Sequence, residues 1–534
     1  MNSLCLPDRD SQQIRMLLEA AHNAELDELV LEHSRRLREH GVYVERLLKN
    51  EAAVLARYLA IDQLTELLKD ADRNCSSPAV LSWIRFMRSL AAVDVGRLEL
   101  VESDPSRLPM AGDLHVENLA NFSKVMRFGP GYRDGIDQIY ALMRADRGAV
   151  IPQQVFFALM SLGGDQETIH DPDTVCSGAA VFVTQSSGPD RWCIIEEGEK
   201  PDPTQNEFAV DSPVVKPLLG KRAGESAVVT SGLSTNTLTV RRIVDKRNYS
   251  KMRIMESYPD SHPDDGFLLR FDAAGPDGKL DPRILGVQMR YWEDEKKQQI
   301  EFYRQHVVPL SWIARAANRP LASAWMHVTR TVDLPLRLVV GTEDEIGSAA
   351  EALQSDLPLV LEPTAAMTIL YTGFWKCLKN TGIEIIVPMA VLNDVWCLIA
   401  DSPYQSDGGS TLQVAGDRAY AEDGNLEGWA RHRWRVGLFL LWLQRDCRLV
   451  DCLPLAKIAP QRRKALINVF GFSATSAIAV AADSRAALWT DDLAVASAAA
   501  EFGVSHRVWT PAVADDCVTR GTVDESEALA LRTG

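Results

Sequence analysis

The sequence predicts a multidomain protein in which an all-α array, a small β-rich domain and an α/β domain follow one another. Apolar residues recur every three or four positions to about residue 163, which is typical of amphipathic helices. The period changes to two between residues 174 and 229, as in strands. From about residue 334, short apolar runs alternate with helical segments, which indicates an α/β domain. A length of 534 residues fits about three or four domains.

The first predicted domain, residues 1–168, is a helical array. Ile14 and Leu18 illustrate the spacing of its apolar face, and Gly41 is one of several breaks between helices. The breaks divide the stretch into about six or seven helices joined by short turns. This layout is that of a tetratricopeptide-like array or of an ordinary helical arm that binds protein partners, and no clean repeat decides between them.

The second predicted domain, residues 169–232, begins with a β-hairpin. Two alternating runs, residues 179–183 and 192–195, flank the turn-forming residues 186–190. The domain is therefore expected to be a small β-rich fold.

Residues 233–330 are interpreted as a connector with helices. A strand-like run at residues 238–244 is followed by segments rich in Pro, Asp and Gly, and a charged helix is expected over residues 291–306. Nothing in this stretch indicates a domain of its own.

The last predicted domain, residues 331–534, has a parallel sheet. Short apolar runs have the length of strands that helices cover on both faces. The runs are residues 336–340, 357–361, 383–387 and 486–490.

Composition limits the function. The chain holds 57 Lys and Arg against 73 Asp and Glu, and its net charge of −16 argues against a general polyanion binder. Its nine cysteines form no zinc-spaced pair, which is typical of reduced thiols in the cytosol. No leader pattern follows Met1, and residues 436–443, the longest apolar run, are less than half a membrane span. We therefore expect a soluble, cytoplasmic protein without a membrane partner.

Residues 210–225 resemble the last helix and turn of the C-terminal domain of Gre-type transcript cleavage factors. Ser212 and Pro213 fit the start of a helix, and Gly220 fits its end. The run Leu-Leu-Gly-Lys-Arg-Ala-Gly at residues 218–224 matches the turn of that family. The resemblance implies an FKBP-like domain that docks on RNA polymerase, although the same fold could instead pack between flanking domains. It does not extend to the acidic coiled-coil tip that cuts transcripts.

The C-terminal region resembles a PIN nuclease domain. The run Leu-Val-Leu-Glu-Pro-Thr places Glu362 where the first strand delivers an acid, and the strand before Asp394 leads into a helix. The run Leu-Trp-Thr-Asp-Asp ends in Asp491 and Asp492 and resembles the fourth-strand signature. The resemblance implies that Glu362, Asp394 and Asp492 hold Mg²⁺ or Mn²⁺, with Asp491 in support, because carboxylates suit such cations and a bound cation activates water.

The sequence departs from the PIN pattern at two acids. Glu362 stands where Asp is usual, and Ser473, Ala474 and Thr475 occupy the place of the third acid. Asp446, Asp451 or Asp483 could substitute for it. Asp394 could also be a helix N-terminal acid and Asp491 an N-cap, as in domains without activity.

A basic strip between Arg431 and Lys464 contains nine Lys and Arg against two Asp, with Trp434 and Trp442 among them. Cations for phosphates and rings for bases are what a channel for single-stranded nucleic acid requires. Residues 436–443 read as a buried helix, so the two tryptophans fit the core better than a stacking platform. The side chains expected to contact phosphate are Arg431, Arg433, Arg462, Arg463 and Lys464.

The order of the three domains resembles the tetratricopeptide, Gre C-terminal and PIN proteins of bacterial conflict and antiviral defence systems. The resemblance implies a metal-dependent endoribonuclease that cuts single-stranded RNA and is directed to RNA polymerase or its transcripts. The alternative is a non-catalytic adaptor that docks on RNA polymerase, with a degenerate PIN domain. The missing third acid favours the adaptor, and the basic strip favours the enzyme.

Overall fold

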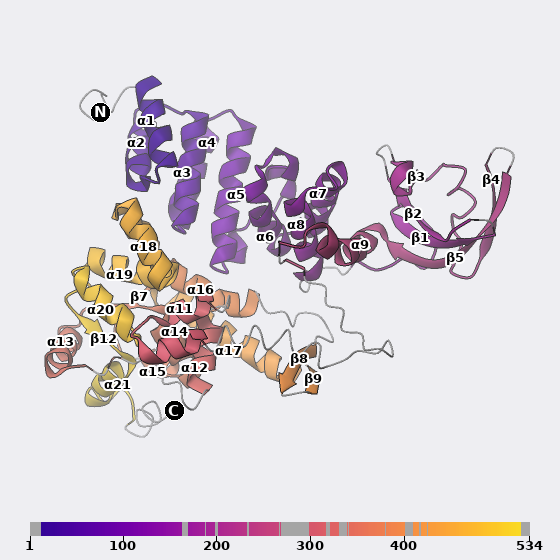
Figure 1. Cartoon of the computed structure of the whole chain (residues 1–534). Helices are drawn as coiled ribbons and strands as arrows, with labels where there is room; N and C mark the ends of the chain where they lie inside the picture. Colours follow the sequence, from indigo (N-terminus) through magenta and orange to yellow (C-terminus); the bar gives the residue numbers. More distant parts are fainter. Residues whose placement is uncertain are drawn as a thin grey trace. The chain divides into compact units, whose positions relative to one another are not determined.

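The chain forms two compact units in a computed structural model (Figure 1). One unit combines Met1–Pro109 with Ala273–Gly534, and the other is Met110–Asp272. The residues that the structure describes are 12–162, 169–186, 188–197, 201–231, 234–265, 267–268, 298–316, 321–330, 339, 341–379, 381–400, 410–415, 418–423 and 426–524.

Residues 12–162, all of them described, form eight α-helices, slightly more than the spacing predicts. Leu18, Val30 and Leu64 are fully buried and show the apolar face that holds the first helices together. Five helices belong to the first unit: α1 (Gln12–Asn23), α2 (Asp27–Glu39), α3 (Glu45–Arg57), α4 (Ile61–Asn74) and α5 (Pro78–Asp94). Three belong to the second: α6 (Leu119–Phe128), α7 (Tyr132–Ala145) and α8 (Val150–Leu162).

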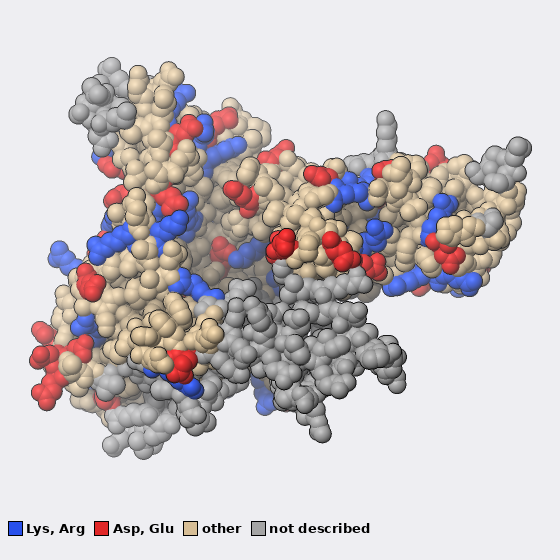
Figure 2. All heavy atoms as spheres, in the orientation of Figure 1, with Lys and Arg blue, Asp and Glu red and all other residues tan. Residues whose placement is uncertain are grey.

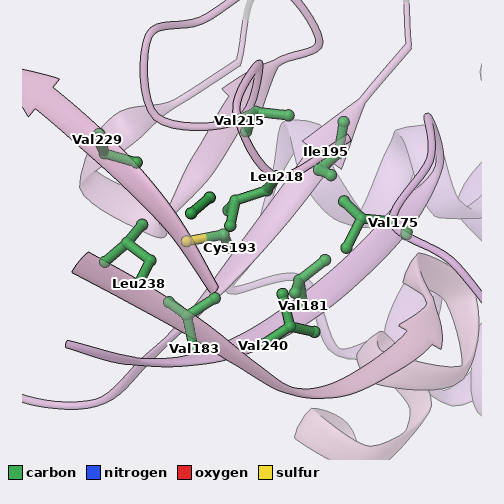
Figure 3. Packing of buried hydrophobic residues seen from close by; sticks show 12 residues of the cluster. Val175, Val181, Val183, Cys193, Ile195, Val215, Leu218, Val229, Leu238 and Val240 are labelled. Atoms are coloured by element: carbon green, nitrogen blue, oxygen red, sulfur yellow. The ribbon is translucent and has the colours of Figure 1, made fainter. Parts of the chain in front are cut away.

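The second unit continues into a five-stranded mixed sheet with the order β3-β2-β1-β5-β4. The predicted hairpin is confirmed, because β1 and β2 pair antiparallel with Val181 opposite Cys193. Figure 3 shows these two side chains packed with Leu218 and Leu238 inside the curled sheet. The elements are β1 (Ala179–Gln185), β2 (Arg191–Glu196), β3 (Glu207–Ala209), β4 (Ser226–Ser231), β5 (Ser234–Asp245) and α9 (Lys246–Ser261).

Two features of this sheet differ from expectation. The run at residues 238–244, interpreted as part of a connector, lies in β5 and pairs with both β1 and β4. Residues 210–220 form consecutive turns where a helix is expected after Ser212. Pro217 explains the turns, because it lacks the N–H for a helical bond and disfavours helical backbone at the residue before it. Gly220 has a φ of 75°, as expected for a residue that ends such a segment.

The C-terminal part of the first unit is an α/β domain with a parallel sheet in the order β10-β7-β6-β11-β12. Its strands are β6 (Leu359–Leu361), β7 (Ile385–Pro388), β10 (Arg448–Val450), β11 (Ala487–Trp489) and β12 (Arg507–Val508). A separate hairpin joins β8 (Ser410–Ala415) to β9 (Arg418–Asp423). The predicted parallel sheet is confirmed. The run at residues 336–340 lies outside the described residues except for Val339.

Helices connect these strands and cover the sheet. Helix α19 contacts β6, β7 and β11, and α16 packs on α19 and α17. The helices are α11 (Leu310–Ala316), α12 (Leu321–Arg330), α13 (Glu343–Gln354), α14 (Pro363–Thr372), α15 (Trp375–Leu378), α16 (Met389–Ala400), α17 (Leu426–Asp446), α18 (Pro460–Phe470), α19 (Phe472–Ser484), α20 (Leu493–Glu501) and α21 (Thr510–Thr519). None of the helices in the described part of the chain is long and apolar enough to cross a membrane.

A buried charge network joins α2 and α3 to the α/β domain. Asp27 is fully buried and accepts hydrogen bonds from Tyr58 Oη at 2.6 Å and from Arg57 Nη1 at 2.9 Å. Arg463 Nη2 of α18 lies 2.9 Å from Asp27 Oδ2 and donates to the carbonyl oxygen of Glu25 at 2.8 Å. The first five helices and the α/β domain therefore share one unit through a contact that satisfies a buried carboxylate.

A second contact lies at the end of α5. Asn393 Nδ2 of α16 donates to the carbonyl oxygen of Asp94. Gly96 has a φ of 71°, and a Cβ atom at this position would lie 2.8 Å from the ring of Trp396. The close approach of the two segments therefore requires glycine at position 96.

Candidate active site at the carboxyl ends of β6 and β11

Three of the predicted acids line one cavity of about 230 Å³. Glu362 follows β6, Asp492 follows β11, and Asp394 lies in α16. The strands β6 and β11 are neighbours, but the chain leaves β6 toward β7 and leaves β11 toward β12 on the other side. Such a reversal of strand order opens a crevice at the carboxyl ends of a parallel sheet, and α/β proteins bind their ligands in this crevice.

Glu362 is 1% exposed and is the N-cap of α14. Its Oε2 accepts hydrogen bonds from the backbone N–H of Thr364 at 2.8 Å, from the Thr364 hydroxyl, and from Thr490 Oγ1 at 2.9 Å. Pro363 at the first helical position fits this start of the helix. Burial, and then the charge of Asp492, raise the pKa of Glu362 to about 8.

Asp492 is the N-cap of α20 and also holds the start of α11. Its Oδ1 accepts from the backbone N–H of Ala494 at 2.8 Å and of Val495 at 3.3 Å. Its Oδ2 accepts from the backbone N–H of Leu310 at 2.7 Å. Burial raises the pKa of Asp492 to about 6 in spite of these three donors.

Asp394 is the least buried of the three acids and lies within α16, as predicted. Burial raises the pKa of Asp394 to about 7, against a smaller lowering effect of the Ser473 hydroxyl. Asp394 lies six positions into α16, and among the described residues no backbone N–H at a helix start donates to its carboxylate, unlike those of Glu362 and Asp492.

Asp491 is separated from these acids. Its Oδ1 accepts from the backbone N–H of Thr510 at 2.7 Å, and its Oδ2 accepts from the Thr510 hydroxyl at 2.8 Å. Both oxygens therefore hold the first residue of α21, and Asp491 is not among the residues that line the cavity. Its geometry is that of a structural link between β11 and α21.

The place of the expected third acid is filled by α19. Ser473 lines the cavity, whereas Thr475 is 1% exposed and its hydroxyl donates to the carbonyl oxygen of Gly471 at 2.6 Å. The candidate substitutes lie elsewhere: Asp451 and Asp483 line a different cavity, and Asp446 is an exposed residue at the end of α17. Among the described residues, no carboxylate takes the place of the third acid in the Glu362 cavity.

Arg315 of α11 also lines the cavity, and sequence reasoning missed it. Its Nη1 donates to the carbonyl oxygen of Ile467 at 3.4 Å and its Nη2 to that of Val469 at 3.1 Å. In the described residues no carboxylate forms a salt bridge with this guanidinium, so Arg315 brings a positive charge that is bound to no single acid of the cavity. The sequence around Arg315 gives no sign of this role, because α11 precedes the first strand of the sheet, β6, by more than forty residues and reaches the cavity only through the tertiary fold.

The comparisons with known proteins agree with the geometry. A family model described as the PIN domain associated with the TPR-GreAB-C-PIN system matches residues 360–501, from β6 to the end of α20. The C-terminal region contains a PIN domain. PIN domains are generally nucleases, which supports a hydrolase role for this region. No curated protein and no solved structure matches the chain.

The donor set of the PIN domain suits a hard divalent cation. Glu362 and Asp492 repel each other in a buried setting, and Glu362 Oε1 has no hydrogen-bond donor among the described residues. Oxygen ligands of this kind are preferred by Mg²⁺ and Mn²⁺. In the described part of the chain, however, no three side chains of Asp, Glu, His or Cys lie close enough to hold one ion together. The acids thus share the cavity without forming a closed three-carboxylate centre.

The basic strip of the PIN domain divides into exposed and buried cations. Arg431, Arg462 and Lys464 are exposed and Arg433 is partly buried, and Figure 2 shows Lys and Arg gathered over α18. The prediction of a surface phosphate contact is wrong for Arg463, which is 4% exposed. Its guanidinium is bound to Asp27 of α2, a partner more than four hundred positions earlier in the chain.

The two tryptophans of the strip also differ. Trp442 is 3% exposed and lies in the core, as predicted, but Trp434 is 70% exposed. Residues two positions apart in a helix lie about 200° apart around its axis, so Trp434 faces away from the buried Val436. The interpretation of Trp434 as a core residue was wrong, and its ring is free to stack on a base.

Proposed function

We propose that the chain is a metal-dependent endoribonuclease of PIN type that cuts single-stranded RNA. The observation that carries the proposal is the convergence of Glu362, Asp394 and Asp492 on one cavity of a PIN domain. Three acids from separate segments meet at the crevice where parallel sheets place their sites. The exposed cations Arg431 and Lys464 supply the attraction for the RNA backbone.

The roles of the side chains follow from their positions. To hold Mg²⁺ or Mn²⁺ together, Glu362, Asp394 and Asp492 would have to move closer to one another than they lie in this structure. Such a cation, when bound, activates water and offsets charge on the phosphodiester. Arg315 contacts a phosphate of the RNA, because it lines the cavity and no carboxylate among the described residues forms a salt bridge with it. Trp434 stacks on an unpaired base.

Cleavage of a labelled single-stranded RNA tests the proposal. The purified chain is incubated with Mn²⁺, with and without a chelator, beside Asp492→Asn and a matched control, Asp483→Asn. Asp483 pairs with Lys457 outside the cavity. We expect metal-dependent cleavage by the wild type and the control and none by Asp492→Asn. Equal cleavage by both variants would exclude Asp492 from the site.

A second candidate is a non-catalytic adaptor. It is favoured by the absence of an acid at Ser473 and Thr475 and by the caps that Glu362 and Asp492 provide, because capping acids need no catalytic role. In this candidate the mixed sheet of the second unit is a Gre-like domain that docks on RNA polymerase in the cytoplasm. Wild-type chain that retains RNA polymerase in a pull-down but cleaves no RNA with Mn²⁺ would support the adaptor.

The two candidates share the docking proposal. In both, a bacterial defence or conflict system uses the Gre-like domain to reach RNA polymerase or its transcripts, and the helical arm binds other proteins. The curled mixed sheet is compatible with this role. A pull-down with the wild-type chain that recovers no RNA polymerase subunit would remove the docking proposal and leave the nuclease proposal intact.

A further inference from the structure

The second unit contains a cavity of about 200 Å³ that is distinct from the PIN site. Side chains from α7, from the β2 and β3 region and from α9 line it together. Apolar wall residues include Met143, Ile194 and Ile254, and the last two are almost fully buried. The cavity therefore offers an apolar wall within one compact unit.

The floor of the cavity is fixed by a buried ion-pair network. Glu207 is 1% exposed and accepts from Arg144 at 2.7 Å, from Arg147, and from the backbone N–H of Asp202 at 3.0 Å. Beside it, the buried Glu196 pairs with Lys246 at 2.8 Å. Because a buried carboxylate with this many donors holds its partners in place, the arginines of the floor are preorganised.

The charged groups that line the cavity do not balance. Arg144, Arg147 and Arg253 face it with Glu207 as the single lining carboxylate, which leaves a net charge of +2. Arg253 is exposed and donates to Tyr249 Oη at 3.2 Å, and no carboxylate pairs with it among the described residues. Two guanidinium groups, those of Arg147 and Arg253, therefore retain N–H donors for a ligand.

We propose that this cavity binds a small organic phosphate. Guanidinium groups match phosphate oxygens with pairs of N–H donors, so Arg147 and Arg253 hold the phosphate group. The organic part of the ligand lies against Met143, Ile194 and Ile254. Inorganic phosphate would accept from the same N–H donors but would make no contact with the apolar wall. The structure therefore favours an organic phosphate over free phosphate.

Isothermal titration calorimetry on the full chain tests the proposal with adenosine monophosphate, inorganic phosphate and adenosine. We expect adenosine monophosphate to bind more tightly than inorganic phosphate and adenosine not to bind. Arg253→Gln should weaken binding by about tenfold or more, since a hydrogen bond to a charged group is typically worth that much. Arg147→Gln is a second variant with the same expected direction.

Arg241→Gln is the matched control, because Arg241 is exposed on β5 and does not line the cavity. Circular dichroism establishes that each variant is folded. No binding of adenosine monophosphate by the wild type would overturn the proposal. So would an affinity that Arg253→Gln and Arg147→Gln leave equal to that of the control, because the ligand would then bind at another site. Equal affinity for adenosine and adenosine monophosphate would exclude phosphate recognition.

Discussion

The replacement Asp27→Ala tests whether the buried network between α2 and the PIN domain holds the first unit together. Asp27 is fully buried, and its partner Arg463 is nearly so, with a side chain that is 5% exposed. After the replacement Arg463 keeps the carbonyl oxygen of Glu25 and a weak pair with the exposed Glu25 carboxylate, 3.7 Å away, but loses its close, buried carboxylate. Tyr58 also loses the acceptor that lies 2.6 Å from its hydroxyl.

The expected loss follows from burial. Breaking a buried ion pair by removing one partner typically costs about 3–5 kcal/mol, because the other charge stays buried without compensation. The pair with Arg57 adds little, since that side chain is 42% exposed and exposed pairs contribute about 1 kcal/mol or less. We therefore expect Asp27→Ala to lower the free energy of unfolding of the first unit by about 3–5 kcal/mol.

Urea unfolding followed by tryptophan fluorescence measures this difference. Glu28→Ala is the control, because Glu28 is the neighbouring acid of α2 and is exposed. It should change the free energy of unfolding by about 0.5 kcal/mol or less. If Asp27→Ala is no more destabilising than Glu28→Ala, the network does not stabilise the contact.

Three further outcomes follow from single features. Arg315→Gln should weaken RNA binding by about tenfold through the loss of a charged donor, measured by fluorescence anisotropy in an inactive Asp394→Asn background; unchanged binding would remove Arg315 from the site. Gly96→Ala should lower the melting temperature, because Gly96 has a φ of 71° and the added Cβ would clash with the ring of Trp396. An unchanged melting temperature would show that position 96 does not require glycine. Burial would raise the pKa of Glu207, but hydrogen bonds from Arg144 and Asp202 outweigh it and lower the pKa below 4.5. Its stabilising effect is therefore complete above pH 4.5 and is lost as the pH falls through the lowered value. Wild type should lose more stability on acidification than Glu207→Gln in thermal melts, and parallel losses would contradict this assignment.

The sheet of the PIN domain was predictable where strands are apolar and buried on both faces. The runs that became β6, β7 and β11 consist almost wholly of buried apolar residues, so periodicity finds them. The edge strands β10 and β12 were missed because they are two or three residues long and contain the charged Arg448 and Arg507. Such short strands form through pairing with a neighbour and leave little pattern of their own.

The position of the acids that line the cavity was predictable for a similar reason. Glu362 and Asp492 follow strands, and parallel strands bring their carboxyl ends to one edge of a sheet. Arg315 and Arg463 were not predictable, because the environment of each is set by residues distant in the chain. The burial of Trp434 was predicted wrongly. Residues 436–443 were correctly read as a mostly buried helix, but Trp434 lies on the opposite, exposed face of that helix.

The most direct test of the proposed nuclease is the rate at which Asp394→Asn cleaves single-stranded RNA with Mn²⁺. Asp394 suits this test better than Glu362 or Asp492, since its carboxylate caps no helix and its loss leaves the helix starts intact. If the three acids act together on a cation, cleavage should fall by about a hundredfold or more while the melting temperature is retained. Cleavage by a folded Asp394→Asn at the wild-type rate would contradict the proposed site.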